Sequence, residues 1–182
     1  MGKIYPSITP ALADWIQRQP MFFVATAPLG AESHVNVSPK GLDTFRITNE
    51  SEVAYLDYTG SGAETIAHIR ENGRITFMFC AFAGPPKIVR LHGRGRTVMP
   101  DSAAGRKLAP LFSSSEPPRS FIVADITRVS DSCGFGVPLM AFQKERDSMA
   151  KWAEGKSPAD LADYRRKKNA VSIDGIAAWD EP

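Results

Sequence analysis

The feature that most constrains the fold is a pair of neighbouring segments with the pattern of β-strands. Residues 74–82 form a short, almost continuous apolar run rich in phenylalanine, which favours a buried strand over a helix. Residues 87–98 alternate between two sets of side chains, which indicates a long strand with one solvent-exposed face. Gly84-Pro85-Pro86 breaks the chain between them. The pattern therefore predicts two successive strands with no helix between them.

Similar strand signals recur along the chain. Further strands are expected at residues 21–27, 33–38, 45–47, 52–58 and 121–129. Short helices are expected at residues 10–19, 61–72, 101–111, 147–152 and 158–168. The regular strand–helix alternation of a doubly wound parallel sheet is missing. We therefore expect a mainly β (α+β) fold, an antiparallel barrel of six or seven strands with short peripheral helices.

Three local signals place helix ends. Thr9-Pro10 has an N-capping residue followed by proline at the first helical position. Ser61 and Glu64 have the spacing of a capping box, in which each side chain bonds an amide at the helix start. Asn72-Gly73 is typical of a helix C-terminus.

Pro39-Lys40-Gly41 is expected to end the strand before it.

Length and composition narrow the class of protein. At roughly 100–200 residues per domain, 182 residues make one domain. We expect residues 1–140 to form the barrel and residues 141–182 to form a helical extension packed on it. The 22 basic and 20 acidic residues give a net charge of +2, which does not support nucleic-acid binding. The longest apolar stretch, residues 75–83, is too short to span a membrane.

Cysteine and histidine usage points to a cytoplasmic protein without a metal site. The two cysteines lack CxxC spacing and cannot form a disulfide framework, which favours a reducing compartment. The three histidines have no metal-ligand spacing. No targeting signal is recognisable at the N-terminus. For Cys133, in a glycine-rich loop, an ordinary turn is favoured over a reactive thiol.

Two groups of residues each allow a functional and a purely structural interpretation. The helix start at residues 61–65 either binds an anion such as phosphate or is an ordinary capped terminus, and the Glu64 carboxylate would repel a phosphate. Arg90, His92, Arg94 and Arg96 share one strand face, which either meets an anion or is a solvated outer face with acidic neighbours. Both alternatives remain open at this point.

Several motifs together resemble the pyridoxamine 5′-phosphate oxidase family. Tyr58-Thr59 ends a strand, a short helix ends at residues 69–72, and a strand follows at residues 74–79. Residues 38–41 and 87–95 lie at the expected distances, and residues 132–138 and 172–175 resemble an uncharacterised branch of the family. The resemblance covers residues 10–140.

The resemblance implies a split β-barrel that binds FMN between the two subunits of a homodimer. In the family, the position of Lys40 reaches the flavin or its phosphate, and the Tyr58-Thr59 backbone borders the isoalloxazine ring. The following helix start, with Ser61, Gly62 and Thr65, holds the phosphate. Lys87 and Arg90 lie on a strand that usually faces the cofactor. The apolar strands around Phe77, Phe79 and Phe82 are expected to supply the dimer interface.

Two departures from the family indicate a different reaction. The oxidases have Ser-Arg-Lys where this chain has Ala63-Glu64-Thr65, and their C-terminal Trp and Arg have no counterpart. We therefore do not expect oxidation of pyridoxamine 5′-phosphate. The leading hypothesis is an FMN-dependent oxidoreductase that passes electrons between NAD(P)H and a small-molecule substrate, with catalytic residues unknown. The alternative is a non-catalytic flavin or haem-binding carrier or sensor.

Overall fold

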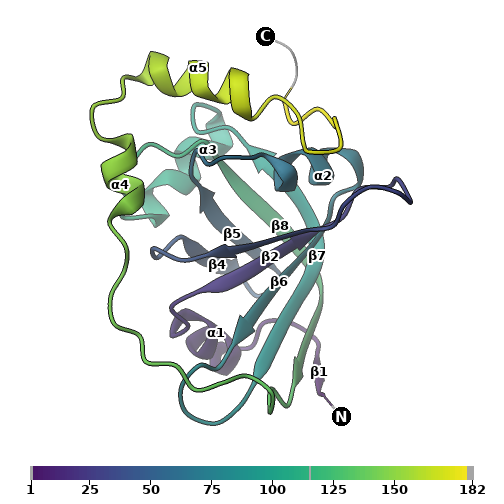
Figure 1. Ribbon diagram of the computed structural model, residues 1–182. Coiled ribbons are helices and arrows are strands. Elements are labelled where there is room, and N and C mark those ends of the chain that lie inside the picture. Colours follow the sequence, from purple (N-terminus) through teal and green to yellow (C-terminus); the bar gives the residue numbers. More distant parts are fainter. Residues whose placement is uncertain (1, 115, 180–182) are drawn as a thin grey trace.

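The computed structural model describes residues 2–114 and 116–179 and consists of one curled antiparallel sheet with short helices around it (Figure 1). The strands are β1 (Ile4–Tyr5), β2 (Phe22–Thr26), β3 (Asn36–Lys40), β4 (Phe45–Asn49), β5 (Glu52–Asp57), β6 (Arg74–Cys80), β7 (Ile88–Val98) and β8 (Ser120–Ser132). Seven of them follow the order β3-β2-β6-β7-β8-β5-β4, and the short β1 pairs with β8. The predicted split barrel with short helices is confirmed, although β1 was not predicted.

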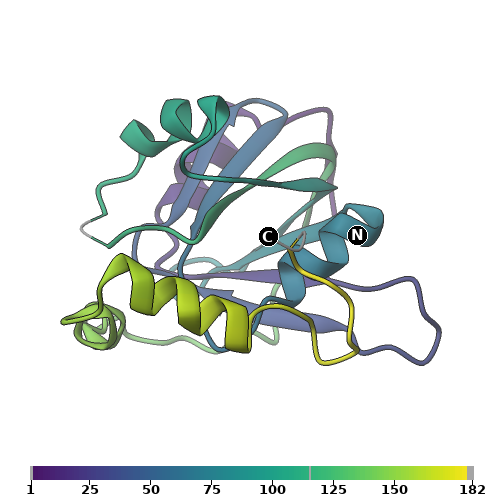
Figure 2. The same cartoon turned by 90° about the horizontal axis from the view of Figure 1, so that it is seen from above.

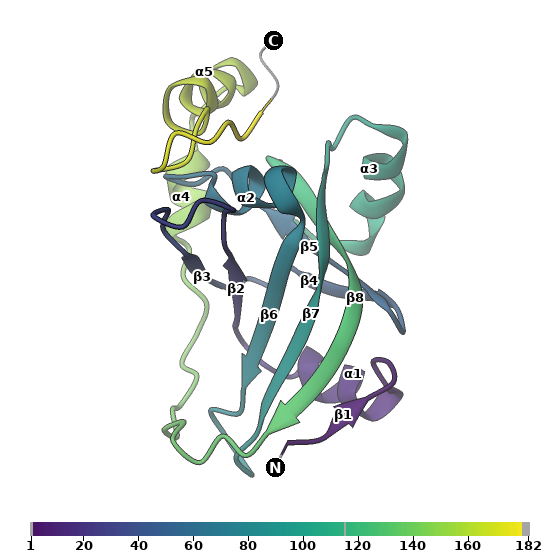
Figure 3. The same cartoon turned by 90° about the vertical axis from the view of Figure 1, so that its right-hand side faces the viewer.

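The sheet is strongly curled but its two edge strands, β3 and β4, do not pair with each other (Figure 3). The long central strands β7 and β8 pair over almost their whole length, with one bulge where Gly93 follows His92. A Cβ atom at Gly93 would lie 2.2 Å from the Asp125 carbonyl oxygen. Only glycine allows this close approach of two backbones, so the bulge depends on Gly93.

The helices are α1 (Pro10–Gln17), α2 (Glu64–Asn72), α3 (Ala103–Leu108), α4 (Ser148–Ala153) and α5 (Pro158–Lys168), with the short 3-10 helix η1 (Ala109–Leu111) after α3. α3 and α5 lie on opposite sides of the molecule, as the view from above shows (Figure 2). An extended segment, residues 133–147, leads from the end of β8 to α4 (Figures 1 and 3). No helix in the described part of the chain combines the length and apolar character needed to cross a membrane.

Helix ends follow the local sequence in three cases and depart from it in one. Thr9 caps α1 by accepting the Leu12 amide, and Gly73 ends α2 with a positive φ of 72°. Ser157 and Asp160 form a complete capping box at α5. The capping box predicted for Ser61 and Glu64 is wrong, because α2 begins later, its N-cap is Ala63 and no side chain caps it.

A second correction concerns β3. The sequence predicted that Pro39 would end the strand, yet β3 continues to Lys40 and pairs with β2 along its whole length. Proline lacks the amide hydrogen needed for a ladder on both sides, but β3 is an edge strand and requires a ladder on one side only.

The main core fills the inside of the curled sheet with aromatic rings. Phe22 contacts Phe45 and Phe79 at centroid distances of 5.0 and 5.6 Å, and Tyr55 and Phe77 complete the cluster. Leu12 and Ile16 of α1 pack against it. A smaller core joins β5 and β8 to Phe112 and Leu108 on the side of α3.

This core excludes the rings of Phe77 and Phe79 from a dimer interface and leaves only the outer face of their strand for one. Phe77 and Phe79 are 0% and 1% exposed, so both rings are already used inside the protomer. The alternation of a strand places their neighbours, Thr76 and Met78, on the outer face instead. Phe82 lies outside the sheet beside Trp15 and Lys87.

Replacement of Phe77 by alanine should therefore lower the free energy of unfolding by about 3–5 kcal/mol, because it leaves a cavity in the aromatic cluster. The matched control is Phe135→Ala, which removes the same side chain where it is 82% exposed and should change stability by no more than about 0.5 kcal/mol. Urea unfolding measures both. Equal effects of the two substitutions would contradict the assignment of Phe77 to the core.

Candidate functional site

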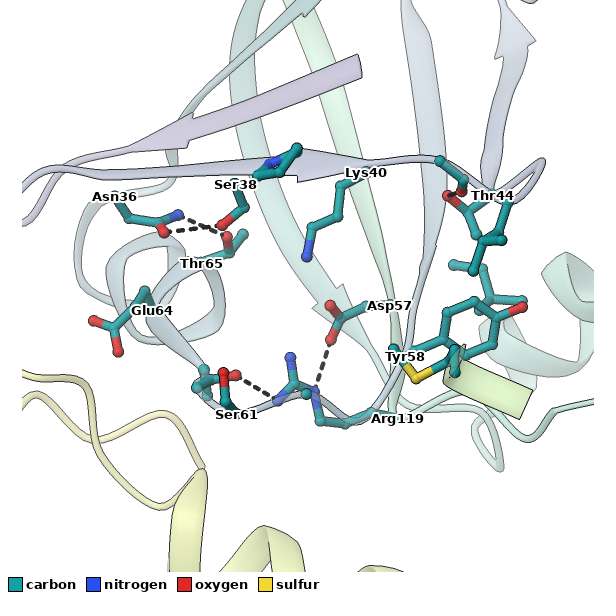
Figure 4. A pocket seen from close by; sticks show the side chains of 18 residues that line it. Asn36, Ser38, Lys40, Thr44, Asp57, Tyr58, Ser61, Glu64, Thr65 and Arg119 are labelled. Atoms are coloured by element: carbon teal, nitrogen blue, oxygen red, sulfur yellow. Dashed lines mark hydrogen bonds and ion pairs between the residues drawn. The ribbon is translucent and has the colours of Figure 1, made fainter. Parts of the chain in front are cut away.

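A cavity of about 380 Å³ opens between the edge strand β3, the end of β5 and the first turn of α2 (Figure 4). Because side chains alternate along a strand, Asn36, Ser38 and Lys40 of β3 line the cavity. The remaining lining residues are Pro39, Gly41, Leu42, Thr44, Leu56, Asp57, Tyr58, Gly60, Ser61, Gly62, Ala63, Glu64, Thr65, Arg119 and Met149. The cavity thus joins two strands, β3 and β5, with the loop after β3, the start of α2, Arg119 and Met149 of the C-terminal segment.

A buried ion pair forms one wall of the cavity. The Arg119 Nε atom donates to Asp57 Oδ2 at 2.8 Å, and the Ser120 hydroxyl donates to the same oxygen at 3.2 Å. Asp57 and Arg119 are only 2% and 4% exposed. The Nη1 atom of Arg119 also donates to the Gly62 carbonyl at 2.8 Å. The pair therefore fixes the end of β5 relative to the loop that leads into α2.

The Lys40 side chain extends toward this pair (Figure 4). No described residue forms a hydrogen bond or ion pair with its ammonium, which lies 5.8 Å from the centre of the Tyr55 ring. Burial lowers the pKa of Lys40; the charge of Asp57 opposes this effect and that of Arg119 adds to it. Lys40 is thus a cation held in the cavity without a direct partner among the residues that the structure describes.

Burial also affects Tyr55 beneath the cavity. Loss of solvent contact raises the pKa of Tyr55 well above its ordinary value, and the charge of Asp57 acts in the same direction. Its hydroxyl is buried, and the Thr65 side chain and the charge of Arg119 only partly oppose this rise. The phenol ring therefore contributes to the site as a neutral aromatic surface beside Lys40.

The first turn of α2 lines the cavity without a capping side chain. The two carboxylate oxygens of Glu64 each lie 3.2 Å from the backbone nitrogen of Ile173, which donates to them, so Glu64 does not fold back onto its own helix. The first amides of an α-helix have no partner within the helix. Together with the helix dipole, they make this turn suitable for an anion.

A small hydrogen-bond network fixes this turn to β3. The Asn36 side-chain amide donates to Thr65 Oγ1 at 3.1 Å and to Thr26 Oγ1 at 3.2 Å. The Ser38 hydroxyl donates to Asn36 Oδ1 at 3.0 Å. The helix start and the edge strand therefore form one rigid wall (Figure 4).

Five of the eight residues predicted from the sequence to bind a cofactor line this cavity: Lys40, Tyr58, Ser61, Gly62 and Thr65. Thr59 lies buried behind it, where its hydroxyl accepts a hydrogen bond from Arg165 Nε at 2.8 Å. The structure thus brings most of the predicted set together around one cavity.

Lys87 and Arg90 do not line the cavity of their own chain. Both belong to the β7 region, and β2 and β6 lie between β7 and β3. Lys87 is 3.8 Å from Asp131 and 5.3 Å from the Trp15 ring. Arg90 is on the outer face and donates to the Ser132 hydroxyl at 3.0 Å.

Arg94 and Arg96, which were predicted to share the strand face of Arg90, also have local partners. Arg96 pairs with Glu52 and Asp125, and Arg94 donates to the Asn72 carbonyl. For Arg96, the interpretation as a solvated face with acidic neighbours is confirmed. Cys133 is a free, exposed cysteine that does not line the cavity.

Sequence reasoning missed Asp57, Arg119, Asn36 and Met149. Asp57 could have been found from the sequence, because it is an acidic residue at the end of an apolar strand. Arg119 lies about 60 residues away, and only the pairing of β5 with β8 brings it to Asp57.

The half-buried ammonium of Lys40 makes stability depend on pH in a defined direction. Because the pKa of Lys40 is lowered by folding, the unfolded chain binds more protons between this lowered value and about 10.5, and stability rises with pH across that window. Lys40→Met should therefore stabilise the protein at pH 7, and the gain should shrink toward pH 10.5. The exposed Lys107→Met is the control in urea unfolding at several pH values. A gain for Lys40→Met that stays constant with pH would contradict the prediction.

Comparisons with known proteins agree with this architecture. The pyridoxamine 5′-phosphate oxidase family matches residues 8–133. The family protein ustO of Aspergillus flavus is 40% identical over 193 residues, which cover 97% of this chain and 77% of ustO.

Two solved structures share the fold. HupZ of Group A Streptococcus has a TM-score of 0.53 at 22% identity, covering 67% of this chain and 91% of its own. A protein described as a possible pyridoxamine 5′-phosphate oxidase, from Lactobacillus delbrueckii, has a TM-score of 0.54 at 19% identity, covering 70% and 98%. On the extent of the family match and the identity to ustO, the chain belongs to the pyridoxamine 5′-phosphate oxidase family.

Proposed function

We propose that the cavity binds FMN and that the protein is an FMN-dependent oxidoreductase acting on a small molecule. The observation that carries this proposal is an uncapped helix start beside a half-buried lysine that has no ion-pair partner among the described residues, in a member of the pyridoxamine 5′-phosphate oxidase family. The helix start suits a phosphate and the lysine suits an electron-accepting ring. A cavity of about 380 Å³ also falls within the usual range for sites that hold small molecules and cofactors.

The α2 end of the cavity fits a phosphate group. The amides of its first turn have no capping side chain, and the hydroxyls of Ser61 and Thr65 line the same wall. The repulsion expected from Glu64 is reduced, because its carboxylate is engaged with the Ile173 amide. These groups replace in part the Arg and Lys that the oxidases carry at the helix start.

The Lys40 side of the cavity fits the ring system. FMN, when bound, supplies transfer of a hydride or of single electrons. Negative charge that develops on the ring is stabilised by a nearby ammonium in a site shielded from water. Lys40 is held over the Tyr55 ring without an ion-pair partner among the described residues, so its charge is available for this task. Asp57 and Arg119 largely neutralise each other beside it.

We also propose a homodimer. Val35 and Val37 of the β3 region are 68% and 61% exposed, and Arg90 and Met78 lie on the same uncovered outer face of the sheet. A second copy would bury this face. It would also allow Arg90 to serve the cavity of the other subunit, which it does not reach in its own chain. Lys87 already has local partners, which makes Arg90 the stronger candidate.

The cavity favours flavin over haem. Its described lining contains neither histidine nor cysteine, so of the residue types that hold haem iron it offers only Tyr58 and Met149. Rapid reduction of the bound flavin by NADH or NADPH would separate the oxidoreductase from a non-catalytic carrier.

Titration with FMN and riboflavin tests the ligand assignment. The wild-type protein should bind both, and FMN more tightly because only FMN has the phosphate. Lys40→Ala should weaken both alike by about 10- to 150-fold, because a hydrogen bond to a charged group contributes about 1.5–3 kcal/mol. Lys107→Ala, on the exposed face of α3, is the matched control. Unchanged affinity of Lys40→Ala for both ligands would refute the role of Lys40.

Sedimentation tests the dimer. The wild-type protein should sediment as a dimer, and Val37→Glu should shift it toward monomer and weaken FMN binding, because it introduces a charge into the proposed interface. Leu29→Glu is the control, since Leu29 is similarly exposed but lies in the loop after β2. A stable wild-type monomer that holds one FMN per chain would rule out a site shared between subunits.

A further inference from the structure

Beyond the residues that line the cavity, we propose that Asn169 is a positioning residue for the phosphate of FMN. This inference rests on the proposed function. Asn169 immediately follows α5 and is 0% exposed. Its side-chain amide forms a hydrogen bond with the loop between β5 and α2. This loop borders the end of the cavity where we place the phosphate. Residue 169 lies well beyond the family match, which ends at residue 133.

Both functional groups of the Asn169 amide are satisfied. Its Oδ1 accepts from Arg119 Nη1 at 2.8 Å, and its Nδ2 donates to the Gly60 carbonyl at 3.0 Å. A buried polar group without partners would be costly, and a buried network with all partners in place is rigid. Asn169 therefore connects the cavity loop to the buried ion pair by bonds protected from water.

These contacts hold two backbone carbonyl groups of the loop between β5 and α2. Asn169 binds the carbonyl of Gly60, and Arg119 binds the carbonyl of Gly62. These two carbonyls flank Ser61, whose side chain lines the cavity (Figure 4). Carbonyl oxygens repel a phosphate and amide hydrogens attract it. Fixing both carbonyls on donors thus favours a loop conformation that leaves the amides at the start of α2 for the anion.

A second contact from the same helix supports this interpretation. Arg165 lies four residues before Asn169, so the two share one face of α5. The Nε atom of Arg165 donates to Thr59 Oγ1 at 2.8 Å. Leu161, four residues earlier again, is buried on this face. The helix therefore holds the loop at Thr59 and Gly60, immediately before the helix start that faces the cavity.

The test compares affinities for FMN and riboflavin. Asn169→Ala should weaken FMN binding by about tenfold and change riboflavin binding by less than about twofold. Thr59→Val, which removes the acceptor of Arg165 with little change in shape, should act in the same direction. Ser157→Ala is the matched control, because it removes the cap of the same helix far from the loop. Equal effects on both ligands, or none, would overturn the inference.

Hydrogen exchange without ligand gives an independent readout. Asn169→Ala should speed exchange of the amides at residues 60–66, and Ser157→Ala should leave it unchanged. If the wild-type protein binds neither ligand, the proposed function fails, and exchange still decides whether Asn169 holds the loop. Unchanged exchange in Asn169→Ala would overturn the inference even where FMN binds well.

Discussion

The buried ion pair between Asp57 and Arg119 is the interaction on which the rest of the site depends. It joins the end of β5 to the residue just before β8, and Arg119 extends the connection to the Gly62 carbonyl and to Asn169. Two charges removed from water are stable only when their remaining hydrogen-bonding groups also have partners. Ser120, Gly62 and Asn169 supply those partners. The geometry of the cavity wall and the docking of the C-terminal helix are therefore parts of one network.

The open side of the sheet explains why the cavity lies where it does. A closed barrel would fill its interior with side chains, as the aromatic cluster around Phe22 does here. Because β3 and β4 do not pair, the inward-facing polar side chains of β3 border space instead of a neighbouring strand. The first turn of α2 meets this space, held by Asn36 through Thr65. A cationic side chain and a helix start thus come together beside an apolar core.

Particular residues show which parts of the site follow from local sequence and which do not. Lys40, Tyr58 and Thr65 were predicted together from motifs that lie near one another in the chain, and they line one cavity. The rings of Phe77 and Phe79 face the core and cannot contact a second subunit, because an apolar run does not reveal which face of a strand is enclosed. The capping role of Glu64 was wrong. Its competing partner, the Ile173 amide, is 109 residues away and gives no local signal.

The sequence by itself determined every strand except β1, most helix ends and the class of fold. These features depend on the alternation of apolar residues and on glycine and proline, whose effects act over a few residues. Only the tertiary structure decided which charges meet. Strand order brings Asp57 to Arg119 and separates Arg90 from the cavity. The contacts of Asn169 form because the C-terminal helix packs back against the loop after β5. The physical reason is range: local conformation is set by neighbours in the chain, whereas a buried polar network joins groups that only the completed fold brings within hydrogen-bond distance.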